Sequence, residues 1–414
     1  MTASPASHGI TRAHREEWAR VVAGLARRFG DLELAEDAAA DAFVAAVELW
    51  PRDGVPPNPG AWLTTTATRK AIDRVRRESQ RGRKHDEAQM LVDDDPPPPI
   101  GAVDDDRLRL LFICCHPALK MSARVALTLR MVGGLTVAEI ARAFFVPTTT
   151  MARRITRAKR TLATARVPFR MPSADDVRER LAGVLAVVFL IFNEGYLSTS
   201  GDDAMRVELS EEAIRLARLL RELLPEEGEV AGLLALTLLI DARRAARVSP
   251  DGELVTLAEQ DRSLWNRERI AEGHAIVHER IAAVADGSAS PGRYQLLAAI
   301  NAVHTDAASA GKTDWRQVVA LYDRLLTVDA SPIVRLNRAV AAAELHGAAE
   351  ALEEVTRLAD VLSGYHAFHA ARADLLRRVD RVDDARRAYD RAIALAGNPA
   401  ERAYLSRRRD DLPG

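Results

Sequence analysis

The sequence predicts an all-α protein built from several helical domains. Ala, Leu and Arg are abundant among the 414 residues while aromatic residues make up only 5%, and the abundant types are strong helix formers. Apolar residues recur at helical spacing, and no stretch shows the alternation that is typical of strands. A chain of this length is expected to hold about two to four domains, with enough core to fold without disulfides or metals.

The net charge of −1 conceals an uneven distribution of charge along the chain. Residues 1–170 carry 27 Lys and Arg against 20 Asp and Glu, whereas residues 171–414 carry 31 against 39. Such asymmetry indicates a half that binds a polyanion and a half with another role. Chance clustering of solvated charges is the alternative, so the local placement of the charges must decide.

Cysteine usage and hydropathy predict a cytoplasmic protein without a membrane partner. The two cysteines, Cys114 and Cys115, are adjacent and cannot form a disulfide framework, which favours a reducing compartment. The longest apolar run, residues 181–192, is shorter than the ~18 residues that span a bilayer, and no leader pattern opens the chain. With no second cysteine pair, core packing is favoured over zinc. We therefore expect no metal and no cofactor.

Three helices are expected before residue 80. The first ten residues look like a frayed terminus, and helical patterning follows at residues 12–30, 33–50 and 60–77. Four prolines between Pro51 and Pro59 are expected to end the second helix. Its apolar positions are expected at Phe43, Val47 and Trp50.

Residues 86–106 are predicted to be a linker between two small helical domains. They contain eight acidic residues, no basic residue and the run Pro96 to Pro99, a composition that cannot bury enough apolar surface to fold. Helices resume at residues 107–167. Pro168 and Pro172 then mark a second boundary.

Residues 134–162 have the pattern of a helix-turn-helix. Thr136 and Glu139 predict a capping box that opens a short helix, and Val146-Pro147 makes the turn. The next helix has an apolar stripe of Met151, Ile155, Ala158 and Leu162, and a basic face of Arg153, Arg154, Arg157, Lys159 and Arg160. A DNA-recognition helix needs one stripe that packs on the first helix and an opposite face that meets phosphates and bases. A solvated basic face is the alternative interpretation.

This stretch resembles region 4 of extracytoplasmic-function sigma factors, the small sigma-70 family members that direct bacterial RNA polymerase to promoters. The match lies at Glu139-Ile140-Ala141, Thr150-Met151, Arg154, Arg157-Ala158 and Leu162, while Ala152 and Arg153 replace the usual Lys and Ser. The resemblance implies contacts with the −35 element of promoter DNA. The implied residues are Thr148, Thr149, Thr150, Arg153, Arg154, Arg157 and Lys159.

The N-terminal segments resemble region 2 of the same family. Residues 35–43 are similar to the helix that docks on core RNA polymerase, with Ala40 at the position of the usual Gln, and residues 59–77 are similar to the segment that melts and holds the −10 element. The implied polymerase-binding residues are Glu36, Asp37, Asp41 and Phe43. The implied −10 residues are Trp62, Arg69, Lys70, Asp73, Arg74, Arg76 and Arg77. The cations would neutralise the DNA backbone and Trp62 would stack on a base; core packing is the alternative for Trp62.

More than half of the chain follows the region 4 segment. Residues 192–202, Phe-Asn-Glu-Gly-Tyr-Leu-Ser-Thr-Ser-Gly-Asp, resemble the hallmark of the subgroup with a C-terminal tetratricopeptide-like extension. The polar groups lack a nucleophile–base pair or metal-ligand spacing, so we interpret the motif as a structural turn or a contact with the sigma domains. An internal repeat supports a repeat domain. Tyr322 and Pro332 recur 67 residues later as Tyr389 and Pro399, about twice the ~34-residue tetratricopeptide period.

The expected organisation is region 2 at 10–85, the acidic linker at 86–106, region 4 at 107–170, a helical extension at 173–285 and helical repeats at 290–414. The leading hypothesis is a non-enzymatic promoter-specificity subunit whose partners are core RNA polymerase and promoter DNA. Its own acidic extension is expected to dock on the basic sigma domains and control them. The alternatives are a helix-turn-helix regulator of another class and a protein-binding repeat scaffold.

Overall fold

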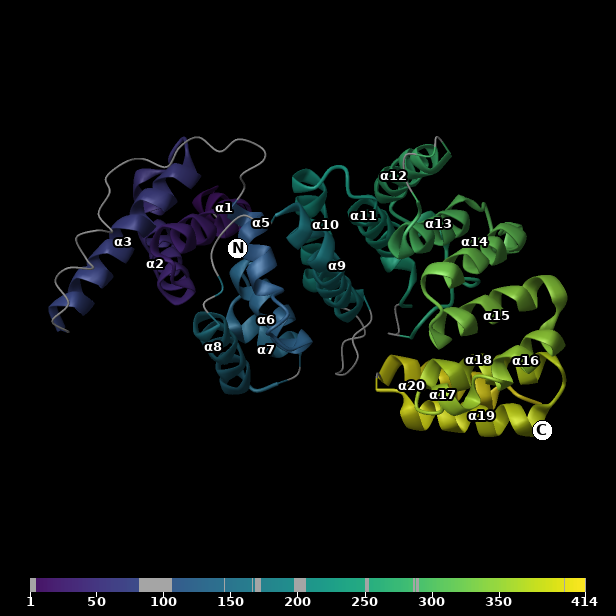
Figure 1. Ribbon diagram of the computed structural model, residues 1–414. Helices are drawn as coiled ribbons and strands as arrows, with labels where there is room; N and C mark the ends of the chain where they lie inside the picture. Colours follow the sequence, from purple (N-terminus) through teal and green to yellow (C-terminus); the bar gives the residue numbers. More distant parts are fainter. Residues whose placement is uncertain are drawn as a thin grey trace. The chain divides into compact units, whose positions relative to one another are not determined.

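A computed structural model describes residues 5–81, 106–144, 146–165, 167, 173–196, 206–249, 253–285, 287, 290–397 and 399–413 (Figure 1). The all-α prediction is confirmed: over these residues the chain forms helices, with one isolated β-bridge between Val248 and Leu254 and no strand. Of the helices in this part of the chain, none is both long and apolar enough to cross a membrane.

The chain divides into two compact units, residues 1–190 and 191–414, and the boundary falls inside α9. Helices of the first unit are α1 (Pro5–Phe29), α2 (Leu32–Asp53), α3 (Pro59–Arg81), α5 (Asp106–Cys114), α6 (Met121–Met131), α7 (Val137–Ala143), α8 (Thr148–Thr164) and the first part of α9 (Ala174–Tyr196). The second unit continues with α10 (Val207–Leu223), α11 (Gly228–Asp241), η1 (Arg244–Ala246), η2 (Arg262–Leu264), α12 (Arg267–Ala285), α13 (Arg293–Asp306), η3 (Ala310–Lys312), α14 (Trp315–Val328), α15 (Pro332–His346), α16 (Ala348–Thr356), α17 (Ala359–Leu362), α18 (His366–Arg378), α19 (Val382–Leu395) and α20 (Pro399–Asp410).

The three N-terminal helices form where the sequence predicts them, with two differences at their ends. Helix α1 begins at Pro5 rather than after residue 10, since proline suits the first helical position. Helix α2 continues through Pro51 to Asp53 and ends at Gly54, whose N–H donates to the carbonyl of Trp50. Pro51 lies in the last turn, where its missing N–H removes only one helical bond.

Helices α5 to α8 form the second part of the first unit. The linker predicted at 86–106 lies outside the described residues except for its last member. Asp106 is the first residue of α5, is buried, and lies 2.7 Å from Nη1 of Arg109 and 3.4 Å from Nε of Arg27. A carboxylate in the first helical turn is stabilised by the helix dipole. The helical module therefore begins one residue earlier than the acidic composition predicts.

The glycine-containing motif at 192–202 begins in the last turn of α9, and its residues 197–202 lie outside the described part. A Cβ on Gly195 would lie 2.3 Å from the backbone nitrogen of Ser210, and the carbonyl of Gly195 accepts a 2.7 Å bond from the N–H of Arg206. The Glu194 carboxylate lies 3.1 Å from Nη1 of Arg206. These contacts hold α9 against α10 and support the structural interpretation of the motif.

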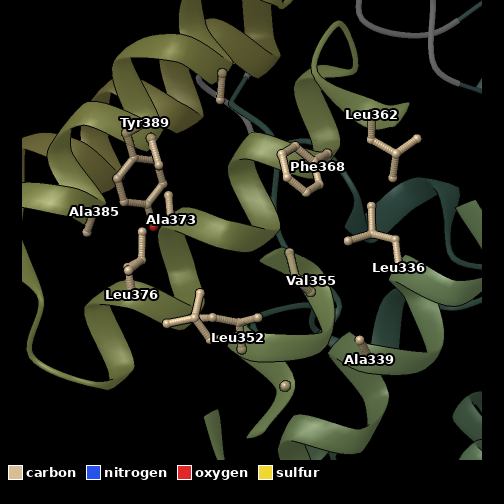
Figure 2. Packing of buried hydrophobic residues seen from close by; sticks show 14 of the residues in the cluster. Leu336, Ala339, Leu352, Val355, Leu362, Phe368, Ala373, Leu376, Ala385 and Tyr389 are labelled. Carbon is tan, nitrogen blue, oxygen red and sulfur yellow. The ribbon is translucent and has the colours of Figure 1, made fainter. Parts of the chain in front are cut away.

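The internal repeat corresponds to two equivalent helix pairs. Tyr322 is the eighth residue of α14 and Tyr389 the eighth of α19, and both helices have 14 residues. Pro332 and Pro399 are the first residues of the helices that follow, α15 and α20. Figure 2 shows the core between these repeats, where Phe368 packs among leucine, valine and alanine side chains and is 1% exposed.

Candidate nucleic-acid interface

Helix α8 separates an apolar stripe from a basic face. Its buried residues are Met151, Ile155, Ala158 and Leu162, the stripe that the sequence predicts. The preceding helix α7 begins with the predicted capping box, in which the Thr136 hydroxyl accepts from the N–H of Glu139 at 3.2 Å and Glu139 accepts from the N–H of Thr136 at 2.7 Å. Helices α6 and α7 both pack on α8 and cover this stripe, while the other face of α8 stays open.

The open face carries most of the residues expected to contact the −35 element. Thr148, Thr149, Thr150, Arg153 and Arg157 are exposed, and Arg154 is half-buried. Within the described part of the chain, none of the three arginines forms an ion pair with a carboxylate. Their positive charge is therefore available to an external anion, and exposed cations of this kind bind DNA phosphates.

Lys159 differs from the other expected residues because it does not lie on this open face. Its Nζ is 2.8 Å from Oε2 of Glu36, and its side chain is 11% exposed. Glu36 itself was expected to meet the polymerase. The structure brings these two residues together in one ion pair, so in this arrangement neither is available to DNA or polymerase.

The Glu36 carboxylate joins α2 to both α6 and α8. Its second oxygen lies 2.6 Å from Nε of Arg130, whose Nη1 also donates to the carbonyl of Leu135 at 2.9 Å. Burial by itself raises the pKa of Glu36, but the charges and hydrogen bonds of Arg130 and Lys159 outweigh it and the pKa is lowered. The carboxylate therefore stays ionised between two cations.

Apolar contacts surround this ion-pair cluster. The indole N–H of Trp18 donates to the carbonyl of Met131 at 3.1 Å, and the rings of His14, Trp18 and Phe43 lie 4.9–5.7 Å apart. Gly134 has a φ of +73°, and a Cβ there would lie 2.8 Å from the His14 ring. Phe43, another expected polymerase contact, is buried in this interface. The three-helix module α1–α3 and the helix-turn-helix module α5–α8 thus pack directly on each other.

Helix α3 carries the residues expected at the −10 element. Arg69, Lys70, Asp73, Arg76 and Arg77 are exposed. Two other residues were expected at the −10 element. Arg74 lies 2.6 Å from Oδ2 of Asp37 on α2. Trp62 is half-buried, and its ring lies 5.5 Å from that of Trp50 in a T-shaped contact, which supports a packing role between α2 and α3.

An exposed face of α2 was only partly anticipated. Asp41 is exposed as expected, and beside it Val44 and Val47 are 56% and 55% exposed. The sequence groups Val47 with Phe43 and Trp50 at helical spacing, but in the structure Val47 is exposed whereas the other two are buried. Residues 37, 41, 44 and 48 follow helical spacing along one side of α2. The same helical spacing, counted in the sequence from Asp37, would have placed Val44 on this exposed side.

The adjacent cysteines are core residues of the helix-turn-helix module. Both are free and buried, and burial raises the pKa of the Cys115 thiol to about 12. Buried thiols of this kind pack as small apolar side chains. Over the described ranges, no group of three or more His, Cys, Asp or Glu side chains is placed to hold a metal ion.

Replacing Glu36 with Gln is expected to loosen the packing of α1–α3 on α5–α8, because Arg130 and Lys159 lose their carboxylate. Breaking such a pair costs about 3 kcal/mol. Amide hydrogen exchange in α8 should rise, whereas Glu48→Gln on the exposed side of α2 should leave it unchanged. Because the pKa of Glu36 is lowered in the folded protein, its ion pairs stabilise the fold fully at pH values above 4.5, the ordinary glutamate pKa. This stabilisation is lost as the pH falls below that value and the carboxylate becomes protonated. Unaltered exchange in the Glu36 variant would contradict this role.

Comparisons with known proteins agree with this division of the first unit. Sigma-70 region 2 matches residues 15–81, sigma-70 region 4 matches residues 109–162, and a family of unknown function, DUF6596, matches residues 180–281. An uncharacterized protein R00370 of Rhizobium meliloti (strain 1021) is 42% identical over 399 residues, which cover 95% of this chain and 93% of the relative. No solved structure matches the chain. Regions 2 and 4 are the promoter-recognition regions of non-enzymatic transcription initiation factors, and with both of them in place the chain belongs to the sigma-70 family.

Proposed function

We propose that this protein is an extracytoplasmic-function sigma factor that binds core RNA polymerase, directs it to promoters with specific −35 and −10 elements, and is controlled by its own C-terminal extension. The observation that carries the proposal is the open basic face of α8, which lies opposite a stripe buried by α6 and α7. This is the arrangement by which a recognition helix enters the major groove.

The geometry of α3 supports a second DNA contact. Arg69 and Lys70 project from the middle of α3 as exposed cations without an ion pair among the described residues. Region 2 and region 4 in one chain give two basic helices, as a factor needs when it holds two separate promoter elements. A helix-turn-helix regulator of another class would have no use for α1–α3.

The exposed side of α2 is the surface that we assign to core polymerase. This surface contains the acidic group of Asp41 and the apolar side chains of Val44 and Val47. Apolar side chains that are exposed together often mark a protein-binding site. Glu36 and Phe43 are not part of this surface in the present arrangement. We propose that the packed arrangement of α1–α3 on α5–α8 is a closed form, from which polymerase binding releases Glu36, Phe43 and Lys159.

Control by the extension rests on charge and on covalent linkage. Residues 1–170 have a basic excess and residues 171–414 have an acidic excess, so the two parts should attract each other. Linkage in one chain raises their effective concentration into the millimolar range. The helical repeats of the second unit offer the stacked surface that repeat proteins use for binding. The extension thereby takes the place of a separate inhibitory or supporting partner.

Arg153→Ala is expected to weaken promoter-specific transcription by about 5- to 150-fold, which corresponds to the ~1–3 kcal/mol of a base or phosphate contact. The side chain is exposed and makes no ion pair among the described residues, so the fold should not change. Transcription in vitro with core polymerase measures the effect, and Arg20→Ala is the matched control on an exposed arginine of α1. Equal losses in the two variants would count against the assignment of α8.

Asp41→Arg is expected to lower the affinity for core polymerase while promoter sequence preference is kept, because the exchange reverses the charge of the exposed α2 face. Asp41 is better suited to this test than Asp37, whose reversal would also release Arg74. The readout is co-purification with core polymerase, with Asp53→Arg at the end of α2 as control. Wild-type recovery of the Asp41 variant would remove this surface from the proposal.

Removal of the extension is expected to change promoter-specific output. A truncation after Met171 leaves the two sigma modules, and a second truncation after Tyr196 also keeps α9, whose first part belongs to the first unit. Higher output than the full chain indicates inhibition by the extension, and lower output indicates support. The same output from the full chain and both truncations would end the idea of control, and no polymerase-dependent start site from any of them would favour a repeat scaffold.

A further inference from the structure

Three arginines of the second unit lie close together without a carboxylate. Arg243 and Arg247 flank the short helix η1 after α11, and Arg262 begins η2. We call these three residues the arginine cluster. None of them forms an ion pair within the described part of the chain. Tyr196, the last residue of α9, packs against the cluster, with the Arg247 guanidinium 4.6 Å from the centre of its ring.

The neighbouring arginines show what a structural arginine has in this fold. Arg244 lies 3.0 Å from Oε1 of Glu211, and Arg269 lies 2.8 Å from Oε2 of the same carboxylate. Both also pair with Asp241, which is buried. Two carboxylates thus balance two arginines. The charges of the arginine cluster, a few residues away, have no such balance.

The cluster satisfies only part of its hydrogen-bonding capacity. Arg243 donates to Oδ1 of Asn301 at 3.2 Å, and Arg262 donates to the carbonyls of His304 and Ala307 at 2.8 Å each. Four buried polar groups have no hydrogen-bond partner. They are Nε of Arg243, Nε of Arg247, Nη2 of Arg262 and the hydroxyl of Tyr196, whose residue is 8% exposed. A buried donor without an acceptor destabilises a protein by about 1–3 kcal/mol. Buried groups of Arg244, Arg269 and Asp241 also lack a well-aligned hydrogen bond, but their charges balance one another, whereas those of the arginine cluster do not.

The positive charge of the cluster shifts the pKa of two groups. Burial lowers the pKa of Arg243, and the nearby Arg247 and Arg262 lower it further. His304 lies beside the cluster, and burial together with the charges of Arg243 and Arg262 lowers its pKa to about 4. The site is therefore positive, and its histidine stays neutral at physiological pH.

We propose that the arginine cluster and the Tyr196 hydroxyl bind a small phosphate-type oxyanion, either inorganic phosphate or a phosphomonoester. Guanidinium groups match the oxygens of a tetrahedral anion, and each can give two parallel hydrogen bonds. The donors without partners are buried, which excludes the backbone of duplex DNA and restricts the proposed ligand to a small anion. The site belongs to the second unit, whereas the basic faces of α3 and α8 belong to the first.

The test is a titration of the full-length protein with inorganic phosphate and sulfate in a chloride-poor buffer, followed by calorimetry and by the midpoint of thermal unfolding. Saturable binding that raises the midpoint is expected. Arg247→Gln should weaken binding by about tenfold or more, the lower end for loss of one charge-assisted hydrogen bond. Arg247 is the best position because the described structure gives its side chain no hydrogen bond. Arg247→Lys, which keeps the charge, should retain part of the affinity, and Arg357→Gln on an exposed arginine of the loop after α16 should retain all of it.

Further titrations distinguish the possible ligands. If a sugar phosphate binds more tightly than inorganic phosphate, the ligand is a phosphomonoester. If inorganic phosphate binds more tightly, the ligand is the free ion. Asp202 and Asp203 follow Tyr196 in sequence and lie outside the described residues. If the wild type binds no oxyanion but the Asp202→Asn/Asp203→Asn double variant does, the chain neutralises its own cluster and the proposal is overturned. It is also overturned if no protein binds saturably, if Arg247→Gln binds as the wild type does, or if duplex DNA displaces phosphate stoichiometrically.

Discussion

The carboxylate of Glu36 is the contact on which the arrangement of the first unit depends. Taking a carboxylate out of water is unfavourable, and the attraction of a single cation often fails to repay it. Here two cations from different helices, Arg130 of α6 and Lys159 of α8, approach the two oxygens of one carboxylate at 2.6 and 2.8 Å. This double pairing fixes the rotation of α8 about its axis. With Lys159 turned toward α2, the arginines of the same helix remain on the open side.

Local sequence patterns predicted the parts of the fold that local physics decides. The stripe from Met151 to Leu162 follows from the helical period, and the capping box of Thr136 and Glu139 follows from the unpaired N–H groups of a helix start. The repeat of Tyr322 and Tyr389 marks equivalent positions in two helices of equal length. Each of these features is set by neighbours within a single helix or helix pair, so it can be predicted from a short stretch of sequence.

Contacts between distant segments were the part that sequence patterns did not predict. Glu36 and Lys159 are 123 positions apart, and no periodicity connects them. A helical projection places Glu36 and Phe43 two turns apart on the edge of the buried side of α2, but it does not say whether a partner protein or the same chain covers that edge. In the structure the same chain covers it: His14 and Trp18 pack on Phe43, and Arg130 and Lys159 pair with Glu36. Val47 shows the reverse case, an apolar residue at helical spacing that the neighbouring helices leave exposed.

Arginines in the described part of the chain occur in three physical states, and the state indicates what each can do. Arg130 and Arg269 are held by carboxylates, and their loss would leave a buried acid without its partner. Arg153 and Arg157 are exposed and solvated, so they cost the fold nothing and signify function only because they share one face of a capped helix. Arg243 is in the third state, with a buried donor and no acid to balance its charge. Asn301 accepts from one nitrogen of this guanidinium, but Nε has no acceptor among its described neighbours, and a small anion that would supply one is the ligand we propose for the site.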